Sequence, residues 1–168
     1  GVLFIGYHAR EGTSNAVLAH TYSSLAFQSY QINGMEEGEM EIDGAFAGKH
    51  GVPVIFVSSD DKCVSQAKER FPWAETVTTK ESLGWNMALS LHPQAAADTI
   101  YQGVQKACAR LSQMEPFEIK EPLSVAIRFK RMDDAAAASL YDRERKPFAL
   151  LDGFIRTGVL DRLEDLFL

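Results

Sequence analysis

Short apolar runs recur along the chain, with polar stretches between them. Residues 2–7 and 53–57 are almost continuously apolar, which is typical of strands covered on both faces of a sheet. Residues 30–34 indicate a strand that runs into a turn, and residues 75–79 indicate a short strand. Residues 124–129 alternate between apolar and polar side chains, so they predict a half-exposed strand.

Helical patterns fill two of the intervals between these strands. Residues 38–49 predict a helix closed by Gly51, because glycine readily takes the left-handed conformation that ends a helix. Residues 60–70 predict a second helix, and Ser59 is expected to cap its first turn. The two aspartates that begin this helix suit the positive end of the helix dipole.

The remaining helical patterns lie in the second half of the chain. A long helix is predicted to begin at Pro93 and to reach about Leu111. Its expected apolar face consists of Ala97, Ile100, Tyr101, Val104, Cys108 and Leu111. Another helix is predicted from about Asp133 to Arg145, and the apolar stretch 148–168 ends in a helical pattern.

The order of these elements predicts the fold class. Strands that alternate with helices indicate an α/β domain with a largely parallel sheet flanked by helices. Pro116 and Pro122 bracket a predicted linker, which separates residues 1–117 from a smaller C-terminal α+β portion at residues 118–168. The chain starts with glycine and enters a strand at once, so we expect a truncated or cleaved N-terminus.

Composition excludes several classes of protein. The net charge is −6 and no basic run is present, which argues against a nucleic-acid binder. No apolar stretch has the length of a membrane span, so no membrane partner is expected. The two cysteines, Cys63 and Cys108, are too few for a disulfide framework and are expected to be apolar filler. This usage predicts a reducing, cytoplasmic setting.

His8 is the first candidate for chemistry. It follows the first predicted strand at its carboxyl end, where open α/β sheets place their ligand sites. An imidazole there could bind a metal ion or move protons. A histidine with a purely structural role is the alternative that the residues alone leave open.

Glu39 is the second candidate. On a helical wheel it shares a face with Ile42 and Phe46, and a carboxylate on an apolar stripe is costly unless it is paired or binds a cation. The alternative is a solvated carboxylate in the first helical turn. The acidic neighbours of Glu39 are expected to form a mostly solvated helix start; they are Glu36, Glu37, Glu41 and Asp43.

The other histidines carry no motif of their own. His20 lies in a segment of uncertain structure, His50 is expected to cap a helix end, and His92 in a loop is assigned no function. The metalloprotease HExxH, the G-x-S-x-G elbow, the P-loop and the dinucleotide G-x-G-x-x-G are all absent.

A resemblance to a known family extends these interpretations. Residues 4–10 read FIGYHAR and resemble the F-x-G-Y-H-A-R segment of the DppA-type zinc-dependent D-aminopeptidases. The likeness covers about residues 3–111. It continues in chain order through His20, Ile32-Asn33, Gly38-Glu39, Ala47-Gly48, Gly51-Val52-Pro53-Val54, Asp60-Asp61, Lys80 and Leu91-x-Pro93.

The resemblance implies an activity and roles for three residues. His8 and Glu39 match zinc ligands of the family, and His20 matches a histidine regarded as catalytic. The family uses two zinc ions, removes N-terminal D-amino acids from short peptides and assembles into ring-shaped homo-oligomers. Residues 1–117 would then be the C-terminal part of the metal-site domain, and zinc-activated water attack is chemically reasonable.

The chain also departs from the family pattern. The marker S-x-D-x-E-G and a further upstream histidine, which supply other zinc ligands, do not occur in it, and one residue is added between His8 and His20. We therefore expect the missing ligands to come from an absent N-terminal region or a partner chain. Two alternatives remain: a non-catalytic binding or assembly subunit that kept the fold, and a different small-molecule enzyme on a similar scaffold.

Overall fold

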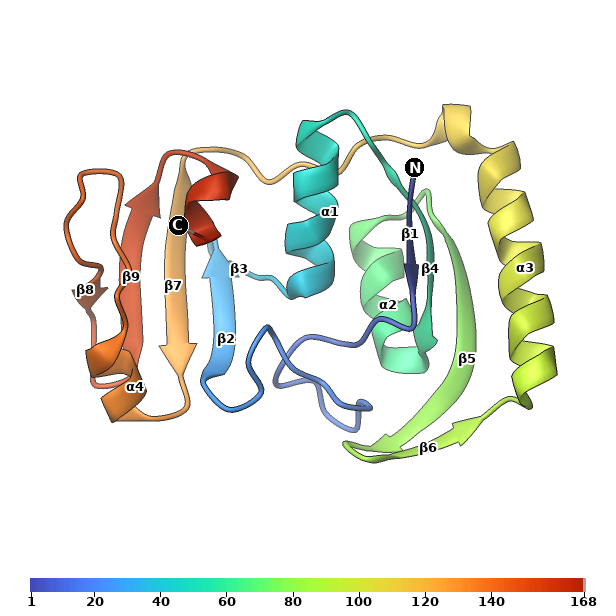
Figure 1. Ribbon diagram of the computed structural model, residues 1–168, viewed down its shortest axis with the longest axis horizontal. Coiled ribbons are helices and arrows are strands. Elements are labelled where there is room, and N and C mark those ends of the chain that lie inside the picture. The colour runs from blue at the N-terminus through green and yellow to red at the C-terminus, as the bar shows by residue number, and fades with distance from the viewer. Residues whose placement is uncertain (168) are drawn as a thin grey trace.

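The computed structural model describes residues 1–167 and contains two sheets with a helix between them (Figure 1). Sheet A has the strand order β1-β4-β5-β6. Its strands are β1 (Val2–Ile5), β4 (Val54–Asp60), β5 (Glu75–Gly84) and β6 (Met87–Ser90). β4 pairs in parallel with both β1 and β5, and the β5–β6 hairpin adds one antiparallel edge.

Sheet B is antiparallel throughout and has the order β3-β2-β7-β9-β8. Its strands are β2 (Phe27–Ile32), β3 (Met35–Glu36), β7 (Leu123–Phe129), β8 (Ala149–Leu150) and β9 (Ile155–Leu160). Since β2 and β3 come before residue 117 and the other three strands after it, the sheet joins segments far apart in sequence.

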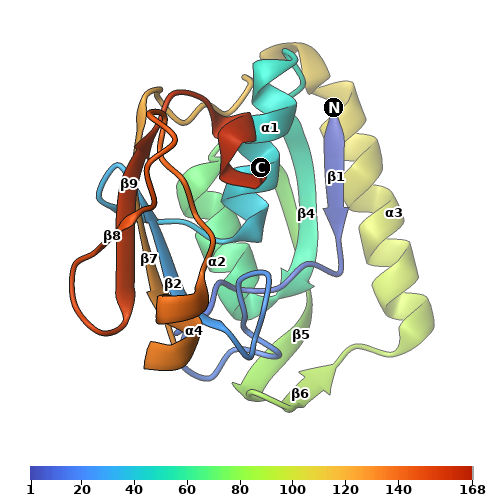
Figure 2. The ribbon, with the colours of Figure 1, turned by 60° about the vertical axis from the view of Figure 1, so that its left-hand side comes forward.

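Helix α1 (Glu39–Lys49) lies between the two sheets (Figures 1 and 2). Ile42 and Ala45 pack into the apolar core on sheet B, whereas Met40 packs into the core on sheet A with Phe4 and Val54. The helix is therefore apolar on two sides, and its N-terminal end comes close to the carboxyl end of β1 (Figure 1).

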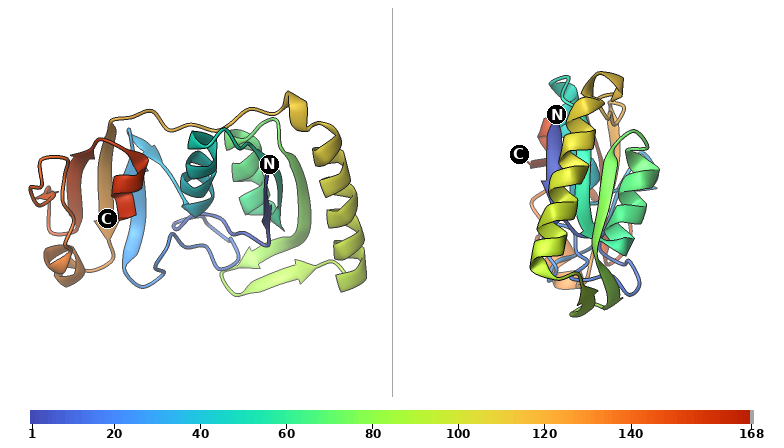
Figure 3. Two further views of the ribbon diagram at one scale, coloured as in Figure 1. Left: turned by 45° about the horizontal axis from the view of Figure 1, so that its top comes forward. Right: turned by 90° about the vertical axis from the view of Figure 1, so that its right-hand side faces the viewer.

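The other helices cover the outer surfaces. α2 (Asp61–Arg70) and α3 (Pro93–Ala109) lie on opposite faces of sheet A, as the right-hand view of Figure 3 shows. The short helix α4 (Met132–Ala137) follows β7, and two 3₁₀ helices complete the fold: η1 (Leu111–Gln113) and η2 (Leu163–Phe167). Within residues 1–167, no helix combines the length and the apolar character that crossing a membrane requires.

The predicted fold class is confirmed. The parallel part of sheet A is flanked by helices, and the C-terminal portion has both strands and helices. The predicted linker contains no helix or strand over residues 114–122. The domain boundary at residue 117 stays a prediction, and Leu168, the last residue of the predicted C-terminal portion, lies outside the described residues.

The first strand does not have the environment that its apolar run predicts. β1 pairs only with β4 among the described residues, and the side chains of Leu3 and Ile5 are 39% and 57% exposed. β4 is the strand that is buried over its whole length. The β5 strand is longer than predicted, and the hairpin strand β6 was not foreseen.

The N-cap of α2 is Asp60 and not Ser59. The Asp60 carboxylate accepts hydrogen bonds from the backbone N–H groups of Lys62 and Cys63. Ser59 remains in β4, where its hydroxyl donates to the carbonyl of Tyr7. Aspartate and serine cap helices about equally well, so the strand pairing of Ser59 decides between them.

The contact face of α3 also differs from the prediction. Ile100 and Val104 do pack against the core, but Tyr101 is 64% exposed and Cys108 is exposed. The helix approaches sheet A through two small residues that are buried, Gly103 and Ala107. Cys108 is therefore not apolar filler. Cys63 is, and burial raises the pKa of its thiol to about 12.

The predicted helix over residues 133–145 is confirmed only at its start. α4 ends at Ala137, and Asp142 then accepts hydrogen bonds from the backbone N–H groups of Glu144 and Lys146. Aspartate side chains that bond nearby backbone groups favour turns over helices. Arg145 follows in the left-handed region, which a helix excludes.

Candidate metal centre

The position of His8 follows from the end of β1. The strand stops at Ile5, and Gly6 turns the chain with a φ of +70°, a conformation that glycine takes without strain. The Tyr7 carbonyl accepts the hydroxyl of Ser59 at the end of β4, and the next residue after His8, Ala9, is fully buried. The histidine is thus held at the carboxyl end of the parallel strands, as the sequence predicted.

His20 lies in the long loop between β1 and β2. Its backbone N–H donates to the Ala9 carbonyl at 3.3 Å. The residues before it are held by the β5–β6 hairpin, because the Leu18 N–H donates to the Trp85 carbonyl at 2.7 Å and the Trp85 indole donates to the Ala19 carbonyl at 3.2 Å. These bonds bring His20 beside His8 despite the irregular chain between them.

Glu39 is the first residue of α1, after the N-cap Gly38. One of its carboxylate oxygens, Oε1, accepts the backbone N–H of Tyr22 at 2.5 Å. Both sequence interpretations of this residue hold in part: it occupies the first helical turn, yet only 18% of its side chain is exposed. The bond to Tyr22 fixes the carboxylate next to the loop that carries His20.

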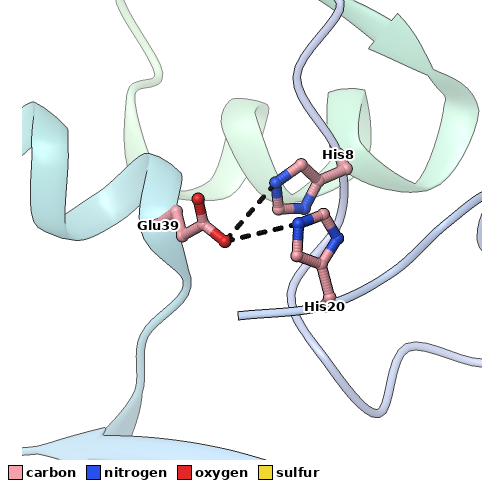
Figure 4. A group of neighbouring side chains, drawn as sticks. All are labelled: His8, His20 and Glu39. Atoms are coloured by element: carbon pink, nitrogen blue, oxygen red, sulfur yellow. Dashed lines mark ion pairs between the residues drawn. The ribbon is translucent and has the colours of Figure 1, made fainter. Parts of the chain in front are cut away.

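The three side chains converge (Figure 4). The Nε2 atoms of His8 and His20 each lie 3.6 Å from Glu39 Oε1. The two imidazole rings are stacked, with centroids 3.7 Å apart and planes at 18°. One ligand atom from each residue lies within 4.8 Å of the other two, so a single cation could contact all three.

Backbone carbonyls orient both imidazoles. His8 Nδ1 lies 3.2 Å from the Ala9 carbonyl, and His20 Nδ1 lies 2.6 Å from the Leu18 carbonyl. A carbonyl only accepts hydrogen bonds, so each Nδ1 carries a proton and each neutral ring has its lone pair at Nε2. This arrangement is the usual support of metal-binding histidines.

The charges in the cluster favour a cation between the three groups. Burial tends to lower the pKa of His8, but Glu39 and the Ala9 carbonyl raise it above its usual value. Burial opposes ionisation of Glu39, yet His8 and the Tyr22 N–H lower its pKa. The carboxylate is therefore ionised. The Nε2 lone pairs of His8 and His20 face this negative charge, so a proton or a metal ion between the three groups is favourable.

The donor set suits zinc. Zinc binds imidazole nitrogen and carboxylate oxygen, and three protein ligands with one open position are typical of its catalytic sites. The site residues come from a strand end, a loop and a helix, and none of these segments contributes a lysine or arginine ion pair to Glu39 among the contacts described. The residues present therefore fit a zinc ion.

The acidic residues at the start of α1 are only partly solvated. Glu37 and Glu41 are buried, with 2% and 1% exposure. Glu37 pairs with Arg70, although burial still raises its pKa to about 7. Glu41 accepts the Gly38 N–H at 2.8 Å and lies 4.0 Å from Arg10. The prediction of solvated carboxylates holds for Glu36, whose side chain is 52% exposed, and fails for Glu37 and Glu41, whose charges Arg70 and Arg10 compensate.

Two further residues beside the cluster were missed from the sequence. The Tyr7 hydroxyl donates to Asp43, and the Tyr7 ring stacks on the His8 ring. Burial and then Asp43 raise the pKa of Tyr7, so the hydroxyl remains a donor. Burial and the charge of Glu39 raise the pKa of Asp43 as well. The one sequence signal was the spacing of four that places Asp43 one turn from Glu39.

Comparisons with known proteins agree on one family. The peptidase M55 model, described as D-aminopeptidase, matches residues 1–147. The D-aminopeptidase of Bacillus subtilis (strain 168) is 27% identical over 140 residues, which are 83% of this chain and 50% of that protein.

A solved structure shares the fold. It is the Zn-dependent D-aminopeptidase DppA from Bacillus subtilis, described as a self-compartmentalizing protease, with a TM-score of 0.89 and 23% identity. The match covers 98% of this chain and 58% of that one. The chain thus spans about half the length of the relatives that it matches.

Proposed function

Because the chain belongs to the peptidase M55 family of D-aminopeptidases, we propose that it forms part of a zinc aminopeptidase. The proposed reaction releases N-terminal D-amino acids from short peptides. The family resemblance carried by residues 4–10 is confirmed by the match over residues 1–147. The preference for D-residues rests on the family and the relatives alone.

The observation that carries this proposal is the convergence of His8, His20 and Glu39 from three separate segments. We assign His8 and Glu39 as metal ligands and His20 as the catalytic residue. His8 offers Nε2 and Glu39 offers Oε1, and the histidine tautomer is set by the Ala9 carbonyl. A cation would relieve the repulsion between the lone pairs and the carboxylate.

When bound, zinc lowers the pKa of a water ligand and polarises a peptide carbonyl. His20 Nε2 faces the same point as His8 Nε2, so it can accept or return a proton there. The Leu18 carbonyl keeps the proton of His20 on Nδ1, which leaves Nε2 as the base. The Tyr22 N–H keeps the Glu39 carboxylate turned toward both rings.

The proposal includes two zinc ions per complete site, as the family resemblance implies. Of the three converging donors, only His8 and Glu39 are assigned as ligands, which is fewer than the three protein ligands that a catalytic zinc usually has. The further donors for both ions would come from the part of the relatives that this chain does not cover, or from a partner chain. Peptide hydrolysis is therefore proposed for the protein that contains the complete set.

Assembly and location are further parts of the proposal. A solved relative is a self-compartmentalizing protease, and we propose a ring-shaped homo-oligomer that encloses the sites. A cytoplasmic location is consistent with two free cysteines, one of them exposed, because exposed thiols persist in reducing compartments. No nucleic-acid partner is proposed for a chain with a net charge of −6.

The test combines metal content with hydrolysis of short peptides that begin with D-alanine or L-alanine. It compares the parent full-length protein with His8→Ala and with His50→Ala. His50 is an exposed histidine at the C-cap of α1, so its removal controls for the loss of an imidazole. Native mass spectrometry counts the zinc ions and the chains in each sample.

We expect the parent and His50→Ala proteins to hold zinc and to cleave the D-peptide, and His8→Ala to lose both. Hydrolysis that survives His8→Ala undiminished would overturn the metal assignment. A parent that holds no zinc and cleaves neither peptide would support a binding or assembly role. Turnover of another substrate class alone would indicate a different enzyme.

A further inference from the structure

Tyr7 lies directly before His8 and reaches across to α1. Its hydroxyl donates to the Asp43 carboxylate, and its carbonyl accepts the hydroxyl of Ser59. Its ring also packs against Phe4, with centroids 4.6 Å apart. Both the backbone and the side chain of this residue are therefore held, one by β4 and the other by α1.

The Tyr7 ring continues the stack of the two histidines. Tyr7 and His8 have ring centroids 5.4 Å apart and planes at 7°, and His20 stacks on His8 with centroids 3.7 Å apart. The His8 ring is thus stacked on two other rings, one from Tyr7 and one from His20. Rotation of the imidazole about its Cβ–Cγ bond would disturb these contacts.

Asp43 ties this stack to the helix that carries Glu39. The two carboxylates are four residues apart on α1, so they lie one turn from each other on the same side of the helix. Tyr7 precedes His8 by one residue, and Asp43 follows Glu39 by one turn. The Tyr7–Asp43 bond therefore joins the two segments that hold the proposed ligands.

We propose that Tyr7 and Asp43 are positioning residues that hold the His8 imidazole at a fixed orientation and position relative to the Glu39 carboxylate. Neither residue belongs to the group of His8, His20 and Glu39, whose ligand atoms converge. They act through the ring stack and through the spacing between the end of β1 and α1. The consequence for zinc rests on the proposed function, whereas the consequence for the orientation of His8 does not.

The expected size of the effect on zinc affinity follows from the behaviour of groups that orient metal ligands. Removing such a group weakens metal affinity by about 10–100-fold, although no ligand is lost. Tyr7→Phe keeps the ring and removes only the hydroxyl. Asp43→Asn keeps an oxygen that accepts a hydrogen bond, so it serves as the conservative variant.

The experiment measures two properties of the parent, Tyr7→Phe, Asp43→Asn and Tyr101→Phe proteins. The first is the NMR shift of the His8 ring protons in metal-free protein, because an aromatic ring stacked over a proton moves its resonance upfield. The second is the zinc dissociation constant by competition with a chromophoric chelator. Tyr101→Phe is the matched control, since it removes an exposed tyrosine hydroxyl on α3.

We expect Tyr7→Phe to reduce the upfield shift of His8, because the aromatic ring is no longer held by Asp43, and to weaken zinc binding about 10-fold or more. Asp43→Asn should lie closer to the parent, and Tyr101→Phe should match it. His8 resonances and zinc affinity that stay at parent values in Tyr7→Phe would overturn the inference, even if its melting temperature fell. If the parent binds no zinc, the proposed function fails while the His8 resonances still decide the inference.

Discussion

The histidine–glutamate cluster and a cavity in the C-terminal portion lie in different parts of the chain. The cavity has a volume of about 510 Å³ and belongs to the C-terminal portion, with an apolar floor at Ile127, Phe148 and Leu160. Four of its charged groups form ion pairs: Arg143 lies 3.4 Å from Asp161 and Arg162 lies 3.1 Å from Asp165. In the cluster, by contrast, the ligand atoms of three residues lie within 4.8 Å of one another.

This difference shows that a cavity large enough for a ligand and a set of donor atoms able to bind a metal ion need not occur in the same place. Paired opposite charges at an exposed surface leave little net interaction for a ligand. Glu39 instead faces two imidazoles whose Nδ1 atoms are held by backbone carbonyls. A functional assignment based on cavity size would select the C-terminal portion, whereas one based on donor geometry selects the end of β1 and the start of α1.

The strongest test of which region binds the metal ion removes one charge from each region. Glu39→Gln keeps an oxygen for the Tyr22 N–H but removes the negative charge, so we expect zinc affinity to fall by more than about 100-fold. Arg145→Ala removes a charge from the cavity wall and should leave zinc affinity unchanged. Isothermal titration of both proteins with zinc checks this. A loss of zinc affinity in Arg145→Ala but not in Glu39→Gln would indicate that the metal ion binds at the cavity.

The next largest effect separates roles within the cluster. His20→Ala should lower kcat for D-peptide hydrolysis by the full-length protein by about 10²–10⁴-fold, the usual contribution of a general acid or base. Zinc content should stay close to that of the parent, because His8 and Glu39 remain. Steady-state kinetics and metal analysis of one preparation test this, and loss of zinc together with activity would make His20 a third ligand.

Much of the scaffold around the cluster could be predicted from local patterns. The apolar run of β4, the glycine-led start of α1 and the alternation of β7 each depend on a few neighbouring residues. These patterns placed His8 after a strand and Glu39 in a first turn. Errors arose where tertiary packing selects between equal local choices, as between Ser59 and Asp60 for the α2 cap.

The position of His20 could not be obtained in the same way. Its loop includes Asn15, Leu18 and Tyr22 in the left-handed region, which no apolar period encodes. The loop is held by Trp85, a residue of the unforeseen hairpin. Only the family resemblance pointed to His20, because the contacts that bring it to His8 and Glu39 join segments distant in sequence.

A smaller effect tests how closely the two segments of the cluster are packed. A Cβ added at Gly38 would lie 2.8 Å from Arg10 Cβ and 3.4 Å from Arg10 Cα, so the His8–Arg10 backbone would have to move. We expect Gly38→Ala to lower the free energy of unfolding by about 1–3 kcal/mol and to weaken zinc binding. Urea unfolding measures this, with Gly84→Ala as the control, because a Cβ there meets no atom within 4 Å.

Equal losses of unfolding free energy in Gly38→Ala and Gly84→Ala would show that the tight contact between Gly38 and Arg10 makes no specific contribution to stability. A loss of stability in Gly38→Ala with unchanged zinc affinity would separate packing at the helix start from the geometry of the donors.

The smallest expected effect concerns the ion pairs of Lys49, the last residue of α1. Lys49 Nζ lies 2.6 Å from both Glu121 and Glu164, and Glu121 also accepts the Leu163 N–H at 2.7 Å. Lys49, and then the Leu163 N–H, lower the pKa of Glu121 from 4.5. The stabilisation is therefore complete above pH 4.5 and is lost as the pH falls through the lowered pKa.

Glu121→Gln should lower the melting temperature at neutral pH by less than about 4 °C, because exposed ion pairs contribute little. The difference from the parent should shrink below pH 4.5, where the carboxyl group takes up its proton. Thermal melts over this pH range test the prediction, with Glu115→Gln, an exposed residue directly before Pro116, as the control. A shift as large as that of Gly38→Ala would contradict the view that paired surface charges matter less than the convergent donors of the cluster.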